Sequence, residues 1–148
     1  MRYCAFLIFL FTLAMPLFTQ SSSAISRQDE FFSIIGLKID ELLSRYGTPV
    51  SVFSSRGDEI WQDDVVFEYE EGNFYLYRDR VWQISIKSAY GMNVGDAKSV
   101  ALLIIGEMAM DFGDYILYNL EYGSWPLALR ININSEKISE IFIFRSDY

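Results

Sequence analysis

The sequence predicts an α+β fold in which a helix followed by an antiparallel β-meander is duplicated in tandem, with the helices packed on one face of the sheet. Three observations favour it. Apolar residues repeat with helical spacing over residues 38–46. Short β-rich runs separated by Gly, Asp, Asn and Ser fill most of the remaining chain. A second helix-like segment near residues 94–105 restarts the same order. Because apolar residues make up 51% of the chain and aromatic residues 17%, we expect a packed core.

The first 24 residues have the layout of a secretory signal peptide. Arg2 supplies a positive charge, residues 4–18 form an uncharged apolar run, and small polar residues follow. Ser22 and Ala24 fit the small positions before a cleavage site. The run is shorter than the about 20 residues of a spanning helix, so we expect cleavage after Ala24 and no stable membrane span afterwards. The protein is therefore expected to be exported, either periplasmic or secreted. An uncleaved anchor is the alternative.

The first repeat is expected over residues 25–88, and it begins with the clearest helix of the chain. One stripe of this helix is formed by Ile39, Leu42, Leu43 and Tyr46. Gly47 and Pro49 end it, because glycine suits the residue after a helix and proline cannot continue one. Strand-like runs follow at residues 50–53, 59–62, 65–69, 74–77 and 81–86.

The second repeat is expected over residues 89–148, in one compact unit with the first. Its helix, near residues 94–105, is apolar on most sides and should be largely buried. Strand-like runs follow at 115–120, 127–133 and 138–144. Residues 36–41 match 91–96 at an offset of 55, and the final strands match at an offset of 57, so a duplication is predicted. A chance likeness of two α-then-β segments is the alternative.

The helix of the first repeat resembles one in a known family. Gly36-Leu37 opens it and Gly47-Thr48-Pro49 closes it, as in the SmpA/OmlA family of small outer-membrane assembly lipoproteins. Trp61 sits where that family has a strand tryptophan, and the likeness covers about residues 36–86. The chain departs from the family at Lys38, where the family has threonine, and it lacks a lipobox.

Two such units in tandem resemble the secreted β-lactamase inhibitor proteins, whose repeats present a concave aromatic surface. The two resemblances imply a non-catalytic envelope protein that acts through protein contacts.

Composition excludes several chemistries. The chain has no His, and its single Cys4 lies in the apolar N-terminal run, so histidine-based nucleophile systems, histidine metal sites and disulfide pairs are excluded. With 12 Lys+Arg against 20 Asp+Glu, the net charge of −8 argues against nucleic acid as a partner. We therefore expect no enzymatic activity, no catalytic residue, no cofactor and no metal.

Aromatic residues on the strands, bordered by acids at 58–71, are the candidate binding surface. A small sheet buries only one face under its helices, so some Tyr and Trp side chains should be exposed and available as interface anchors. The sequence predicts a protein or peptide partner in the cell envelope with a basic rim. The predicted contact residues are Trp61, Tyr69, Glu70, Glu71, Tyr75, Tyr77 and Trp125. A small carboxylate-dependent hydrolase of envelope glycans is the alternative.

Overall fold

The computed structural model describes residues 31–56, 64–120 and 125–147. In chain order the elements are α2 (Ile39–Tyr46), β1 (Ser51–Ser55), β2 (Asp64–Tyr69), β3 (Gly72–Tyr77), β4 (Arg80–Ile86), β5 (Ser88–Ala89), β6 (Met92–Asn93), α3 (Lys98–Ile105), the 3-10 turn η2 (Gly106–Met108), β7 (Met110–Asp111), β8 (Tyr115–Leu120), β9 (Leu127–Asn134) and β10 (Lys137–Arg145). The signal segment, the expected strand at 59–62 and Trp61 lie outside the described residues.

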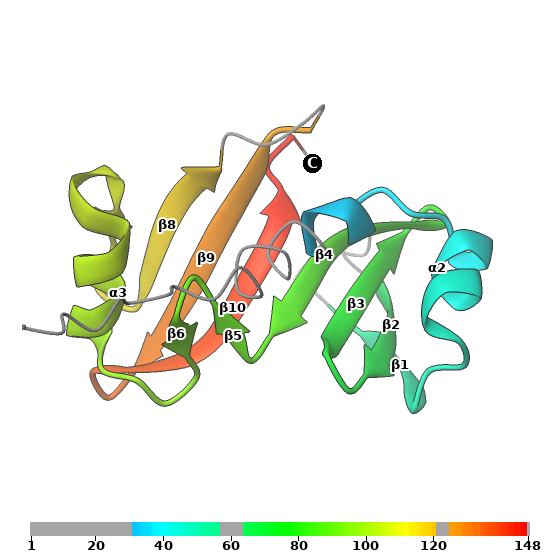
Figure 1. Cartoon of the computed structure of the whole chain (residues 1–148), viewed down its shortest axis with the longest axis horizontal. Coiled ribbons are helices and arrows are strands. Elements are labelled where there is room, and N and C mark those ends of the chain that lie inside the picture. The colour runs from blue at the N-terminus through cyan, green and yellow to red at the C-terminus, as the bar shows by residue number, and fades with distance from the viewer. Residues whose placement is uncertain (1–30, 57–63, 121–124, 148) are drawn as a thin grey trace, which may run out of the picture.

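Eight of the strands form one antiparallel sheet (Figure 1). Its order is β1-β2-β3-β4-β10-β9-β8-β7, while β5 and β6 form a separate small hairpin. The centre of the sheet is the pairing of β4 with β10, where Ile84 lies opposite Ile143 and Ile86 lies opposite Ile141. These β-branched pairs join strands that are far apart in the sequence, and they make the sheet continuous across the molecule.

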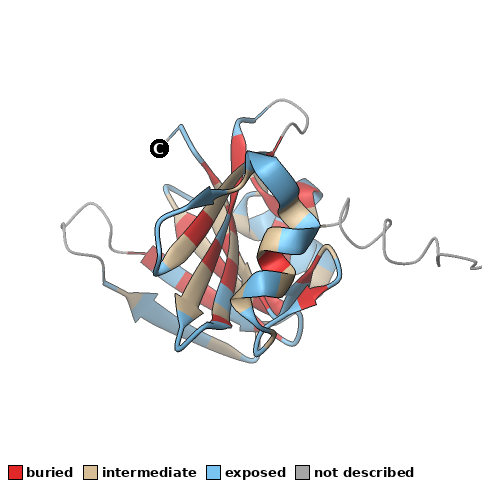
Figure 2. Cartoon of the chain, turned by 90° about the vertical axis from the view of Figure 1, so that its left-hand side faces the viewer, coloured by how far each residue is buried: buried red, intermediate tan, exposed pale blue. Residues whose placement is uncertain are grey.

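One side of the sheet forms the hydrophobic core. Alternate strand residues such as Phe74, Ile84 and Ile131 point to this side and are fully buried, because successive side chains of a strand face opposite ways. The described helical segments add Phe32, Ile34, Leu42 and Ala101 to the same cluster. Figure 2 looks at the molecule from the end that carries α3, and this helix lies against one side of the strands.

The predicted helix at 38–46 is confirmed as α2. The Lys38 amide donates to the Glu41 carboxylate at 2.8 Å, which satisfies a backbone N–H that the first turn leaves without a helical partner. Leu42 is fully buried. The helix ends at Gly47, whose φ of 75° suits a residue without a side chain and whose N–H donates to the carbonyl of Leu43.

The predicted fold class is wrong, although the antiparallel pairing is confirmed. In the described residues the molecule is mostly β, with one eight-stranded sheet and only short helices, α2 and α3 having eight residues each. It is not a duplicated helix-then-meander α+β fold. The physical reason is the β4–β10 pairing, a long-range contact that local hydrophobic spacing cannot reveal.

The second helix also departs from its prediction. It begins at Lys98 rather than near residue 94, because Asp96 accepts the Asn93 amide in a turn instead of lying in the first helical turn. Only Ala101 is buried, while the Leu103 side chain is 83% exposed. An almost wholly apolar helix of two turns can therefore stand largely outside the core.

Candidate functional site

The side of the sheet opposite the core carries the candidate site, and we name it the open face. It consists of the strand residues that alternate with the core residues, and none of these belongs to the core cluster. Across β3, β4, β10, β9 and β8 they are half-buried or exposed apart from Ala128. The side chains that matter below are Tyr75, Tyr77, Trp82, Phe142, Phe144, Arg130 and Tyr115, with the carboxylates of Asp64, Glu68 and Glu140.

Strand pairing brings the aromatic residues of the open face together. Tyr75 lies opposite Gln83 of β4, and Gln83 lies opposite Phe144 of β10. The ring of Tyr75 meets that of Phe142 edge to face, with 6.3 Å between centroids. This geometry is favourable for aromatic pairs. Side chains from two strands that do not pair with each other therefore form one surface.

A bulge in β4 adds Trp82 to this surface. The register shifts between the Tyr75–Gln83 and Leu76–Val81 pairs, so Trp82 has no partner of its own on β3. Its indole N–H donates to the Asp64 carboxylate on β2 at 3.1 Å, reaching across β3. Asp64 is only 7% exposed, and this bond satisfies a buried carboxylate oxygen.

The other half of the open face contains a stack built on Tyr115. The ring of Phe112 lies parallel to that of Tyr115 at 4.7 Å and 18°. The guanidinium of Arg130 lies over Tyr115 at 4.4 Å from its centroid. Arg130 Nε donates to Asn132 at 2.8 Å, and the Asn132 amide donates to Glu140 at 2.9 Å. Aromatic, cationic and anionic groups are thus linked across three strands.

The charges of two carboxylates act on Tyr75. Burial raises the pKa of the Tyr75 phenol, and the carboxylates of Glu140 and Asp64 raise the pKa further because they oppose a second negative charge. The exposed Glu68 lies in the row of Phe142 and Arg130, opposite Asn73. A cationic group of a partner would therefore be attracted to this half of the open face.

Among the described residues that were predicted to contact a partner, Tyr75 and Tyr77 alone lie on the open face. Tyr69 is a correction: it is 7% exposed, its ring packs on Tyr46 and Phe74, and its hydroxyl donates to the Gly47 carbonyl at 3.0 Å. Its position in the alternation of β2 places it in the core.

Glu70 and Glu71 lie in the β2–β3 turn and are exposed. The charge of Glu71 acts on Tyr69, whose pKa is raised first by burial and then by this carboxylate. The two acids therefore stand at the end of the sheet rather than on its open face.

Trp125 is placed away from the open face, beside the end of β10. The Arg145 guanidinium stacks on its ring at 3.8 Å, and Arg145 lies on the core side because it continues the alternation of Ile141 and Ile143. A Cβ on Gly36 would lie 3.3 Å from the indole nitrogen, so glycine leaves room for this ring. Trp125 is 41% exposed, but its ring lies between Gly36, which precedes α2, and Arg145, which ends β10.

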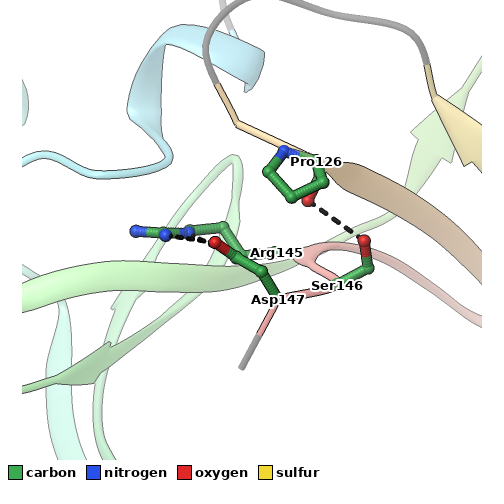
Figure 3. Close-up of polar contacts among 4 residues, drawn as sticks. All are labelled: Pro126, Arg145, Ser146 and Asp147. Carbon is green, nitrogen blue, oxygen red and sulfur yellow. Dashed lines mark hydrogen bonds and ion pairs between the residues drawn. The ribbon is translucent and has the colours of Figure 1, made fainter.

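Polar contacts among Pro126, Arg145, Ser146 and Asp147 further stabilise this end of β10 (Figure 3). Arg145 forms a two-pronged ion pair with Asp147, at 2.9 and 2.7 Å. Ser146 donates from its amide and its hydroxyl to the Pro126 carbonyl, at 2.9 and 3.2 Å. The arrangement ties residues 145–147 to residues 125–126, and it indicates a structural role for Trp125.

The predicted contact residues did not include Trp82, Phe142, Phe144, Tyr115 or Arg130, which the structure places on the open face. The signal for two of them was present, because Phe142 and Phe144 alternate with the buried Ile141 and Ile143. Arg130 also stood on the wet side of an alternating strand. What alternation could not reveal is that β10 lies between β4 and β9, which brings these residues beside Tyr75.

No group of three or more metal-binding side chains occurs among the described residues. Two exposed carboxyl groups, those of Asp111 and Asp147, have a lowered pKa. Hydrogen bonds from Lys98 and Arg145, respectively, are the main cause. A lowered pKa is the opposite of what a general acid requires.

Comparison with known proteins gives no family assignment. No protein-family model matches the chain, and no curated protein matches it. An extracellular protein containing an SCP domain from Bacillus anthracis str. Ames matches with 9% identity and a TM-score of 0.48, over 78% of this chain and 45% of that one. A cysteine-rich secretory protein from Staphylococcus aureus subsp. aureus Mu50 matches with 11% identity and a TM-score of 0.47, over 78% and 46%.

The chain spans less than half of each of these proteins. Likenesses this distant assign neither a fold family nor a function to the chain, and the resemblance to the SmpA/OmlA family stays a prediction. None of the described helices is long and apolar enough to cross a membrane.

Proposed function

We propose that this protein is an exported, non-catalytic module that binds a protein or peptide partner of the cell envelope through the open face. One observation carries the proposal. The aromatic side chains of Tyr75, Phe142 and Tyr115 stay half-buried on the sheet face opposite the core, with Arg130 between the last two. Export rests on the signal-like segment at residues 1–24.

The size of the open face suits a peptide or the central part of a protein interface. The five strands β3, β4, β10, β9 and β8 span about 19 Å at about 4.8 Å per spacing, and five residues of strand span about 17 Å. The flat area is on the order of 300 Å², and side-chain relief and the strand ends add to it. A standard interface takes about 800 Å² from each partner. The open face would therefore supply the centre of such an interface.

The chemistry of the open face supports recognition by aromatic anchors. Half-exposed Tyr, Trp and Phe rings offer large apolar area at low entropic cost, and they dominate the binding energy of many interfaces. The acidic side chains Glu68 and Glu140 favour a partner with basic groups at its rim. The absence of histidine supports the non-catalytic part of the proposal.

Partner capture followed by reconstitution tests this function. The purified chain is incubated with the envelope fraction of its source, and a retained protein is purified and titrated by calorimetry. We expect a stoichiometric complex whose affinity falls at least tenfold in a Tyr75→Ala/Phe142→Ala variant, because truncating hot-spot residues typically costs 1–2 kcal/mol or more.

The matched control is Leu103→Ala, which removes a highly exposed apolar side chain from α3. It should leave the affinity unchanged. A complex that ignores the double variant would overturn the assignment to the open face. Turnover of envelope glycans by the purified chain would overturn the non-catalytic reading and favour the hydrolase alternative.

A further inference from the structure

Arg130 is the basic side chain in the middle of the open face. On one side it lies opposite Phe142 of β10, and on the other side opposite Leu117 of β8. It is exposed, and the acids Glu68 and Glu140 belong to the same face. A docked partner would therefore meet a positive charge among the aromatic rings.

The guanidinium of Arg130 is held in place rather than free to rotate. Tyr115 supports its flat side at 4.4 Å, and Phe112 supports Tyr115 in turn. Asn132 fixes its edge by accepting the Nε hydrogen at 2.8 Å. A long exposed side chain normally loses up to about 2 kcal/mol of rotamer freedom when it is ordered. Because these contacts already order the Arg130 side chain in the free protein, binding a partner costs less side-chain entropy.

These contacts use Nε and one flat side of the guanidinium, and the two terminal nitrogens donate no hydrogen bond to any of the described residues. Within the part of the chain that the structure describes, Arg130 forms no ion pair, and Asn132 stands between it and Glu140 by donating to that carboxylate at 2.9 Å. One N–H group from each terminal nitrogen can donate to the two oxygens of a carboxylate in a planar, bidentate arrangement.

We propose that Arg130 binds a carboxylate of the protein partner, either an Asp or Glu side chain or a chain end, while the partner's aromatic or basic residues lie toward Tyr75. The inference rests on the proposed function of the open face. A single carboxylate fits better than a polyanion, because Glu140 is close by and the chain has a net charge of −8. The open face thus offers a cation to an acidic group of the partner and carboxylates to its basic groups. This arrangement sets the partner's orientation.

Peptides selected against the purified chain test the inference. A random twelve-residue library displayed on phage is panned on the chain, and enriched peptides are synthesised. Their dissociation constants are then measured for the unaltered chain and for Arg130→Gln, Arg130→Lys, Tyr75→Ala and Arg45→Gln. Arg45 is the matched control, since it is also an exposed arginine stacked on a tyrosine, Tyr46, but it lies on α2.

We expect the peptides that depend on Tyr75 to carry an acidic residue or to need a free chain end. Arg130→Gln should weaken them at least tenfold, Arg130→Lys should restore part of the loss, and Arg45→Gln should change little. Converting the peptide acid to its amide should weaken binding to the unaltered chain. It should not weaken binding to Arg130→Gln, because that variant already lacks the guanidinium that the acid would contact. An amidated chain end separates the two sources of carboxylate.

The outcomes distinguish this inference from the function on which it rests. Peptides that lose affinity in Tyr75→Ala but bind Arg130→Gln within twofold overturn the carboxylate site and leave the binding face intact. If all recovered peptides bind Tyr75→Ala and Arg130→Gln as tightly as the unaltered chain, both the carboxylate site and the proposed binding face are overturned. Thermal unfolding of each variant identifies any loss that comes from a destabilised fold.

Discussion

Phe74 and Tyr75 are neighbours on β3, yet they belong to opposite sides of the molecule. Phe74 is fully buried, and its ring packs against Tyr46 and Tyr69. Tyr75 is half-buried and meets Phe142 of β10 at 6.3 Å. The two sides of one sheet thus use the same residue class for different purposes. The aromatic richness of the chain is divided between a core that holds the fold and a face that we propose binds a partner.

Truncation of the two neighbours gives the largest expected difference between the two sides. Phe74→Ala should lower the free energy of unfolding by about 3–5 kcal/mol, because it leaves a cavity in the core. Tyr75→Ala should cost about 1–2 kcal/mol, since part of its surface already faces water. Urea unfolding followed by circular dichroism measures both. Equal losses of unfolding free energy would show that Tyr75 is packed as tightly as the core residue Phe74.

Local patterns predicted the elements of this fold better than their assembly. The stripe of Leu42 and the stop at Gly47 depend on contacts within one helix, and α2 formed as expected. The pairing of Ile84 with Ile143 depends on residues that are far apart, and no local spacing specifies it. This is why the strands were identified while the continuous sheet was not.

The candidate site shows the same division. Alternation assigns Tyr75 and Phe142 to outward positions within their own strands, but only the order of strands shows that they meet. Tyr69 was misassigned because the presence of a tyrosine on a strand does not show whether its side chain faces the core or the open face. Its burial depends on α2, whose Tyr46 and Gly47 it contacts.

A pair of leucines on α2 sharpens the comparison between buried and exposed positions. Leu42→Ala should reduce the free energy of unfolding by about 2–5 kcal/mol, because its side chain is fully buried. Leu43→Ala should cost less than about 1 kcal/mol, since that side chain is 39% exposed although the same helical stripe contains it. Thermal and urea unfolding of both variants check this. A Leu43 effect equal to that of Leu42 would show that both face the core.

Alkaline titration separates a core tyrosine from an open-face tyrosine. The pKa values of Tyr69 and Tyr75 are both raised, first by burial, then by Glu71 for Tyr69 and by Glu140 and Asp64 for Tyr75. Because the folded state keeps these protons more tightly, their contribution is complete below pH 10 and is lost as the pH rises through the raised values.

Stability should therefore begin to fall above about pH 10, the ordinary value for tyrosine. Glu140→Gln should lower the pKa of Tyr75 and leave that of Tyr69 in place, as followed by carbon-13 chemical shifts of the tyrosine rings. A shift of Tyr69, or none of Tyr75, would contradict the placement of Glu140 beside the open face.

The smallest expected effect concerns Glu70 and Glu71 at the end of the sheet. Both are exposed and lie outside the open face, so they can steer a basic partner but cannot anchor it. A Glu70→Gln/Glu71→Gln variant should slow association modestly and leave dissociation unchanged, as measured by surface plasmon resonance with the captured partner. The slowing should disappear at high salt, because the screening length falls from about 8 Å at physiological ionic strength to about 3 Å at 1 M. A faster dissociation that persists at high salt would place the two carboxylates in direct contact with the partner, and the binding surface would then extend beyond the open face to the β2–β3 turn.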